Sequence, residues 1–257
     1  MGLPKLVSLP KGFKYLTSLR DLHIEDCNQL GSSGDKDDDD MPWQGFRSLQ
    51  SLKIDGLPKL VSLPKGLQYV TTLRDLYIED CNQIGSSGDK DDDDMPWQGF
   101  RSVQSLDIIG LPKLVSLPKG FQYLTSLQKL TILGCDQLES LNSEDDDDMP
   151  WQGFRSLQCL KIYRLPKLVS LPKGLQYFTT LRDLTIGYCR NLTALPEWIS
   201  NSSSLSKLQI KGCPKLSKRC RNNMGMDWSK IAHIPNIQID YKWIQEDGCY
   251  QYSSSTG

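Results

Sequence analysis

The chain has 257 residues, of which 38% are hydrophobic and 24% charged, and its formal net charge at pH 7 is −1. This length supports a sizeable buried core without disulfides or a metal, which excludes a small stapled scaffold. No apolar run approaches the roughly 20 residues that a membrane-spanning helix needs. We therefore expect no contact with a membrane.

The cysteine content and the start of the chain both bear on the compartment. Eight cysteines in a chain of this length do not indicate a disulfide framework. The N-terminal segment also lacks the apolar core of a secretory signal. Both features favour a reducing environment, and we predict a cytoplasmic protein.

The near-neutral net charge hides two opposed populations. Runs of acidic residues fill three segments, 35–40, 89–94 and 144–148, and hold 15 of the 31 Asp and Glu residues. The rest of the chain is basic on balance. The total charge therefore says nothing about which partners either population attracts.

An internal repeat determines the predicted architecture. The string Gly-Leu-Pro-Lys-Leu-Val-Ser-Leu-Pro-Lys-Gly begins at Gly2, Gly56 and Gly110, and it returns from Leu165 at the same spacing of 54 residues. Each block holds two copies of Leu-x-x-Leu-x-Ile-x-x-Cys/Leu-x-x-Leu, the signature of leucine-rich repeats. The copies begin at Leu19, Leu49, Leu73, Val103, Leu127, Leu157, Leu181 and Leu205, with a degenerate ninth at Ile234.

Each copy predicts one short strand. In the third copy, Leu76 and Ile78 alternate with Asp, Tyr and Glu residues, so one face of the strand is buried and the other solvated. A single turn cannot bury its leucines alone, and successive turns must stack. We predict an α/β solenoid, a leucine-rich-repeat horseshoe of about nine turns with a concave parallel sheet. Its convex side is irregular or short-helical and carries the three acidic loops.

The domain boundaries follow from the ends of the repeat. The solenoid is expected to cover residues 1–240, and a polar C-terminal tail residues 241–257. The chain begins in the middle of a turn, because Gly2 aligns with Gly56, which directly follows a strand. We expect a truncated start, since a solenoid needs a polar cap at each end.

Two recurrent residue types have structural explanations. The turn after the strand carries a cysteine at Cys27, Cys81, Cys135, Cys189 and Cys213, where a small buried residue fits a tight bend. The tryptophans of the recurring Met-Pro-Trp-Gln-Gly-Phe string are expected to pack against the convex side of the core. No Cys-x-x-Cys pair occurs, so we predict no metal site.

The outward strand positions are the candidate ligand-binding surface. They are acidic in the first third, apolar and aromatic in the middle, and basic in the last third. Equivalent outward positions change strongly between blocks, from Lys53 to Asp107 and from Asp55 to Ile109. Diversification of a binding surface predicts such changes, and so does drift at unconstrained positions. The predicted protein-binding residues are Tyr77, Asp107, Ile109, Leu133, Lys161, Tyr163, Arg164 and Tyr188.

Catalytic chemistry has no support in the sequence. The chain has two histidines, His23 and His233, and no nucleophile elbow, zinc-protease helix or phosphate-binding loop. We predict no catalytic residue, no cofactor and no enzyme activity. The basic C-terminal stretch lacks interleaved exposed aromatics, so nucleic acid is an improbable partner.

Three segments near the C-terminus form a specific pattern: residues 192–199 (Leu-Thr-Ala-Leu-Pro-Glu-Trp-Ile), 212–220 (Gly-Cys-Pro-Lys-Leu-Ser-Lys-Arg-Cys) and 225–235 (Gly-Met-Asp-Trp-Ser-Lys-Ile-Ala-His-Ile-Pro). They closely resemble the C-terminus of plant nucleotide-binding leucine-rich-repeat disease-resistance proteins. The resemblance covers nearly the whole chain, and this ending is its most specific part. It implies an intracellular immune receptor whose repeat arm senses pathogen effectors or modified host proteins. It also implies a nucleotide-binding domain in cis as a partner, although this chain has no phosphate loop. The alternatives are a stand-alone repeat adaptor or scaffold and a non-functional fragment of a resistance gene.

Overall fold

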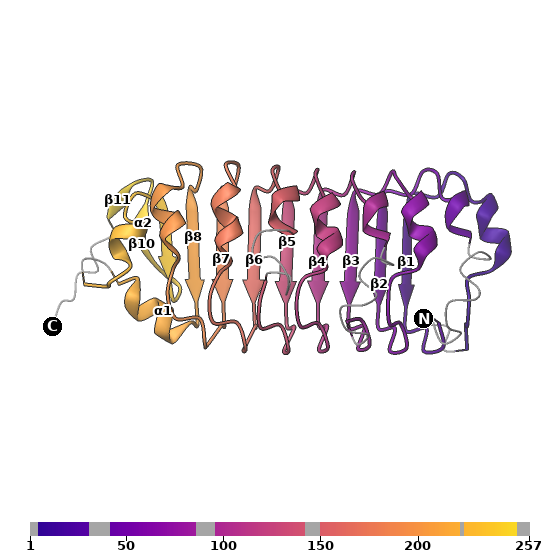
Figure 1. Ribbon diagram of the computed structural model, residues 1–257, viewed down its shortest axis with the longest axis horizontal. Coiled ribbons are helices and arrows are strands. Elements are labelled where there is room, and N and C mark those ends of the chain that lie inside the picture. Colours follow the sequence, from indigo (N-terminus) through magenta and orange to yellow (C-terminus); the bar gives the residue numbers. More distant parts are fainter. Residues whose placement is uncertain (1–4, 31–41, 86–95, 142–149, 222–223, 251–257) are drawn as a thin grey trace.

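A computed structural model describes residues 5–30, 42–85, 96–141, 150–221 and 224–250. Its strands form one 11-stranded sheet whose spatial order is the order of the chain (Figure 1). The strands are β1 (Asp21–Glu25), β2 (Ser51–Asp55), β3 (Asp75–Glu79), β4 (Ser105–Ile109), β5 (Lys129–Leu133), β6 (Cys159–Tyr163), β7 (Asp183–Gly187), β8 (Lys207–Lys211), β9 (Asn236–Ile239), β10 (Lys242–Glu246) and β11 (Cys249–Tyr250).

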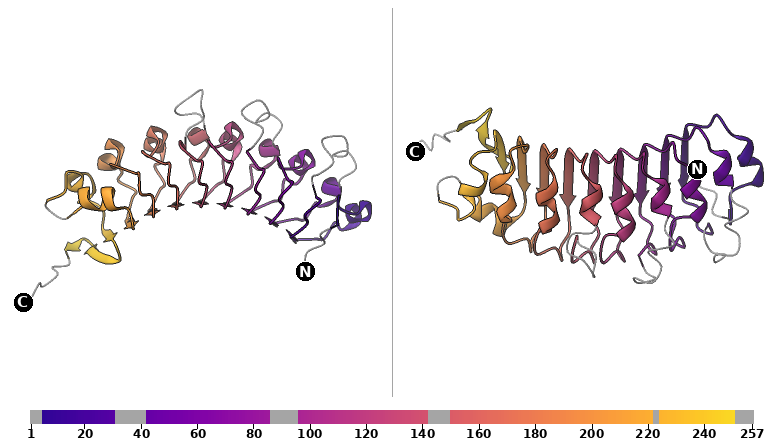
Figure 2. Two further views of the ribbon diagram at one scale, coloured as in Figure 1. Left: turned by 90° about the horizontal axis from the view of Figure 1, so that it is seen from below. Right: turned by 45° about the horizontal axis from the view of Figure 1, so that its top comes forward.

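Strands β1 to β9 are parallel, and equivalent residues of successive repeats pair without a register shift from β1 to β8. Figure 2 shows that the sheet lines the inner side of an arc, with the helical segments along the outer side. The predicted leucine-rich-repeat solenoid, its concave parallel sheet and its nine turns are therefore confirmed.

Short helices cover the convex side. The 3₁₀ helices are η1 (Lys11–Tyr15), η3 (Pro42–Gly45), η4 (Lys65–Tyr69), η6 (Pro96–Gly99), η7 (Lys119–Tyr123), η8 (Pro150–Gly153), η9 (Lys173–Tyr177) and η10 (Glu197–Asn201). A proline directly precedes or begins each of them, as the fixed φ of proline favours. Two α-helices follow β8, α1 (Pro214–Arg219) and α2 (Trp228–Ile231). The three acidic runs lie outside the described residues.

The core consists of the inward strand residues and the leucines of the turns. Strands β2 to β4 alternate half-buried and buried residues, as the sequence pattern predicts. The five turn cysteines are buried, and their thiols donate to the carbonyl group two residues earlier, as from Cys81 to Glu79 at 3.3 Å. Burial raises the pKa of Cys81 to about 11. The five turn cysteines are packing residues, and all eight cysteines of the chain are free.

Each tryptophan of the Met-Pro-Trp-Gln-Gly-Phe string joins two turns. Trp43, Trp97 and Trp151 are almost completely buried, and each makes an edge-to-face contact with the phenylalanine three residues later. The ring of Trp43 lies against Gly66 in the next turn, and Gly45 approaches the backbone of Lys14 in the preceding one. The predicted convex packing of the tryptophans is confirmed, and the glycines are what permits it.

A cap closes the C-terminal end. The predicted polar tail contributes β10 and β11. Strand β10 pairs antiparallel with β9 on one side and with β11 on the other. Gln245 of β10 is buried and donates to the carbonyl of Ile234 at 3.0 Å. The burial of residues 242–246 does not alternate regularly, because a register shift between Trp243 and Gln245 interrupts the pairing with β9. This irregularity hides the strand from pattern reading.

A buried carboxylate holds the cap to the solenoid. Asp227 is completely buried; its Oδ2 accepts from Arg219 Nε at 2.8 Å and from the Leu195 N–H at 3.1 Å. Lys230 Nζ lies 3.2 Å from its Oδ1. Asp227 therefore links α1, α2 and the turn before η10 through one charged centre.

The first described turn is less buried than its equivalents. Leu16 is 41% exposed, whereas Val70 at the same position of the next block is 1% exposed. Leu19 and Leu22 are half-buried, whereas Leu52 is buried. No strand pairs with the outer edge of β1 within the described residues.

Candidate functional site

Each strand from β1 to β8 presents three outward residues, so the concave face carries three rows of side chains. The register places Glu25, Asp55 and Glu79 side by side in the third row of β1 to β3. Ile109 and Leu133 continue this row, followed by Tyr163, Gly187 and Lys211 on β6 to β8. The concave face therefore changes from acidic through apolar to basic along the arc.

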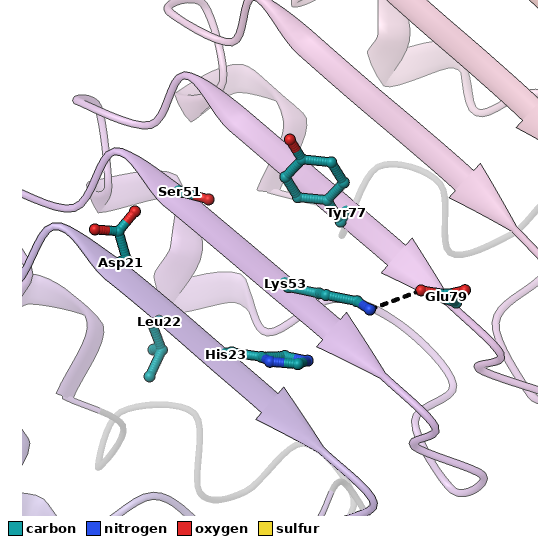
Figure 3. A pocket seen from close by; sticks show the side chains of 7 residues that line it. All are labelled: Asp21, Leu22, His23, Ser51, Lys53, Tyr77 and Glu79. Atoms are coloured by element: carbon teal, nitrogen blue, oxygen red, sulfur yellow. Dashed lines mark ion pairs between the residues drawn. The ribbon is translucent and has the colours of Figure 1, made fainter.

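The acidic end contains a shallow hollow of about 410 Å³. It is lined by Asp21, Leu22, His23, Ser51, Lys53, Tyr77 and Glu79 (Figure 3). The Lys53 ammonium lies 2.9 Å from Asp55 Oδ2 and 2.8 Å from Glu79 Oε2. These hydrogen bonds raise the pKa of Lys53. Lys53 thus neutralises carboxylates that would otherwise repel one another across adjacent strands.

Tyr77 and Asp107 lie at the boundary of this acidic end. They are directly opposite each other in the second row of β3 and β4. Burial, together with the charges of Asp75 and Asp107, raises the pKa of Tyr77. Its hydroxyl therefore stays protonated at neutral pH and can donate a hydrogen bond to a ligand.

The predicted apolar stripe is continuous in space. Ile109 lies opposite Leu133, and Leu133 lies opposite Tyr163, in the third row of β4, β5 and β6. All three side chains are only partly buried on the concave face. Neighbouring exposed apolar side chains of this kind are typical of interaction surfaces.

The predicted basic and aromatic residues gather beyond the stripe. Lys161 is exposed in the second row of β6, and Arg164 directly follows that strand with a φ of 51°. Tyr188 follows β7 with a φ of 56° and is 43% exposed. Left-handed backbone costs an ordinary residue about 1–2 kcal/mol. In the part of the chain that the structure describes, neither Lys161 nor Arg164 forms an ion pair.

Sequence reasoning missed two features of this end. The hydroxyl groups of Tyr188 and Tyr241 are hydrogen-bonded, although the residues are 53 positions apart. Thr185, Gln209 and Gln238 form a side-chain ladder across β7, β8 and β9, with Gln209 Nε2 2.8 Å from Gln238 Oε1. The polar tail that begins at Tyr241 gave no sequence signal for the contact between Tyr188 and Tyr241, because this contact depends on where the β9–β10 turn folds back.

Across the described ranges, no group of three or more His, Cys, Asp or Glu side chains is placed to hold a metal ion. Burial raises the pKa of the half-buried Cys159 thiol on the concave face, which argues against a reactive thiolate there. None of the helices within these ranges is both long and apolar enough for a membrane crossing.

Comparisons with known proteins give one consistent result. Residues 90–219 match the family model of RPS2-like plant disease resistance proteins, leucine-rich repeats. Putative disease resistance protein RGA4 of Solanum bulbocastanum is 44% identical over 54 residues, 21% of this chain and 6% of that protein. Disease resistance protein RPS6 of Arabidopsis thaliana is 29% identical over 251 residues, 91% of this chain and 21% of that protein.

Among solved structures, an internalin (InlF) of Listeria monocytogenes is similar with a TM-score of 0.40 and 16% identity, over 81% of this chain and 69% of that one. The matched regions are about a fifth or less of the length of the two curated relatives, RGA4 and RPS6.

Proposed function

Because this chain belongs to the RPS2-like leucine-rich-repeat family of plant disease resistance proteins, we propose that it is the protein-recognition arm of a plant immune receptor. The arm senses a pathogen effector or a modified host protein in the cytoplasm, without enzyme activity or a cofactor of its own. A nucleotide-binding domain in cis is its proposed partner, by analogy with the family.

The apolar stripe of Ile109, Leu133 and Tyr163 carries this proposal. These residues are opposite one another on adjacent strands, partly exposed, and centred on the concave face. Nine strands about 4.8 Å apart give an arc of roughly 38 Å, which is long enough for a protein ligand. Interfaces obtain most of their affinity from such central apolar and aromatic side chains, with charged residues at the rim.

A paired-variant interaction assay tests the proposal. The full chain is screened by yeast two-hybrid against a panel of pathogen effectors and plant proteins. The concave variant Ile109→Glu with Leu133→Glu is compared with the control Val115→Glu with Val169→Glu. Val115 and Val169 are exposed aliphatic residues outside the sheet, so both double variants make the same chemical change.

We expect the concave variant to lose the partners that the wild-type chain binds, and the control to keep them. Circular dichroism must show equal folding of both variants. Partners that survive the concave change, or that are lost equally in the control, contradict recognition through the concave face. This result would favour an adaptor that binds through another surface.

A further inference from the structure

Three tyrosines lie at the C-terminal end of the concave face, on β6 and directly after β7 and β9, and we name them the tyrosine shelf: Tyr163, Tyr188 and Tyr241. The ring of Tyr163 lies over Gly187, and a Cβ atom there would overlap it. The ring of Tyr188 lies over Gly212, where a Cβ atom would be 2.7 Å from Cδ1. Tyr241 joins the shelf through the hydrogen bond between its hydroxyl and that of Tyr188. The absence of a side chain at Gly187 and Gly212 therefore leaves the space that the rings of Tyr163 and Tyr188 occupy.

The backbone of the shelf is unusual in a way that points to function. The residue directly after each strand from β1 to β9 has positive φ. At most of these places it is a glycine or an aspartate, two residue types that tolerate this backbone: Gly56, Gly110, Gly134, Gly212, Asp26, Asp80 and Asp240. At the same place Arg164 and Tyr188 have φ values of 51° and 56°. Bulky residues are disfavoured there, and strained backbone concentrates at functional sites.

The two C-terminal hairpins provide an internal comparison. Asp247 and Gly248, between β10 and β11, both have positive φ, with glycine at the second position as such turns prefer. Asp240 and Tyr241, between β9 and β10, also both have positive φ, at 45° and 69°. Tyrosine therefore occupies the position at which the other hairpin has glycine. The side chain of Tyr241 is 63% exposed, and it contacts Tyr188 and Lys211.

Basic residues lie next to the shelf residues, on β6, directly after β6 and on β8. Lys161, Arg164 and Lys211 form no ion pair with any described residue. Lys211 Nζ lies 5.8 Å above the ring centre of Tyr241, and Lys207 Nζ lies 5.9 Å above that of Trp243. By contrast, Lys53 at the other end of the face is bound to two carboxylates. The charges of Lys161, Arg164 and Lys211 are thus available to an external anion.

The geometry points to a docking site for an acidic segment of a protein partner. Carboxylates of the segment pair with Lys161, Arg164 and Lys211, and aliphatic stems of its Glu side chains pack on the rings. The inference rests on the proposed function of the concave face and specifies the chemistry of its ligand. It also predicts how the partner is oriented along the concave face, because its acidic segment lies at the β6–β9 end and away from the carboxylates of β1 to β3.

The charge distribution favours an acidic protein segment over nucleic acid. Asp183 and Asp240 lie within the basic end, on β7 and directly after β9. Glu25, Asp55 and Glu79 occupy the same concave face further along. A phosphate backbone carries a charge at every nucleotide and would meet these carboxylates, whereas a short acidic segment of a protein ends before them.

Fluorescence anisotropy with a defined probe tests the inference. The probe is a fluorescein-labelled octaglutamate peptide, and the protein is the full chain at low salt. We expect Lys211→Glu and Arg164→Glu each to weaken binding by about tenfold or more, as for close charge pairs in interfaces. Lys218→Glu makes the same change on an exposed residue of α1, outside the sheet, and should leave binding near the wild-type value.

A second variant keeps the test independent of folding. Arg164→Gly removes the cation, and glycine suits the left-handed backbone. This variant should therefore fold, yet bind the probe more weakly than the wild-type chain does. Three results would overturn the inference: an equal loss of peptide affinity in Lys218→Glu, unchanged peptide affinity in Lys211→Glu and Arg164→Glu, or tighter binding of a labelled eight-nucleotide oligothymidine than of the peptide. The two tests can fail separately. If the inference is overturned but the concave double variant still loses its partners, the proposed function stands. If the peptide binds as expected but the concave double variant keeps its partners, the proposed function is overturned instead.

Discussion

The indole ring of Trp43 lies directly against Gly66 in the next turn of the solenoid, where an added Cβ atom would be 2.7 Å from Cδ1 of the ring. The same contact recurs between Trp97 and Gly120 and between Trp151 and Gly174. Because each ring is buried, it cannot move aside without disturbing the convex packing.

Gly66→Ala should therefore destabilise the chain by about 1–3 kcal/mol, the usual cost of overpacking a core. Gly12→Ala is the matched control, since Gly12 occupies the same position of the first block and has nothing within 4 Å of its added Cβ. Urea denaturation followed by circular dichroism measures both. Equal stability of the two variants would refute the Trp–Gly contact as a packing constraint.

Asp227 should be a key residue of the C-terminal cap. Asp227→Ala leaves Arg219 and Lys230 without their shared carboxylate and the N–H of Leu195 without its acceptor. We expect a loss of about 2–4 kcal/mol, somewhat reduced from a fully buried pair because Arg219 is partly exposed. Hydrogen exchange should show the loss first in α1 and α2. Protection there that matches wild type would contradict this role.

The same carboxylate gives a defined acid dependence. Burial acts to raise the pKa of Asp227, but hydrogen bonds from Arg219, Leu195 and Lys230 outweigh it, so the folded-state pKa is lowered. An unfolded Asp titrates near about 3.9. Its contribution to stability is therefore complete above that pH and is lost as the pH falls through the lower folded-state pKa. Urea midpoints measured from pH 5 down to pH 2 should fall more steeply for wild type than for Asp227→Asn, and parallel curves would exclude this effect.

Backbone strain at Arg164 should be measurable by a reciprocal pair of substitutions. Gly134 precedes Arg164 by one turn, at the equivalent place, with a φ of 67° and only ordinary contacts around an added Cβ. Gly134→Ala should cost about 1 kcal/mol through strain, whereas Arg164→Gly should be neutral or stabilising by up to about 1 kcal/mol. Thermal unfolding compares the two variants. Clear destabilisation by Arg164→Gly would show that its side chain supports the fold.

Lys53 should stabilise the acidic end in a salt-dependent way. Lys53→Met removes the cation between Asp55 and Glu79 and leaves their charges in repulsion. We expect a loss of about 0.5–1 kcal/mol at low ionic strength, the range for partly exposed pairs, and a smaller loss in 1 M NaCl because salt screens such charges. A loss that does not depend on salt would indicate packing by the lysine stem instead.

Much of the fold follows from local periodicity, while the basic end of the site depends on contacts between distant residues. The alternation around Leu76 and Ile78 predicts the strand, the strand register and the apolar stripe, because one register serves every repeat. The seat of Tyr163 on Gly187 and the contact between Tyr188 and Tyr241 do not follow from any repeat. They depend on the exceptions to the pattern: a glycine in the third row, and a hairpin that returns along β9.

The Trp–Gly contacts also have a consequence for how the length of this molecule can change. Each block presents the same joint to the next, including the hydrogen bonds from Lys59 to Gln29 and from Lys113 to Gln83, both at 2.6 Å. A gene that gained or lost one complete 54-residue block would keep every joint intact. Such an exchange would move the acidic and basic ends of the concave face apart or together by two strands, about 10 Å. Recombination between blocks can therefore change the span of the concave face without a new packing solution.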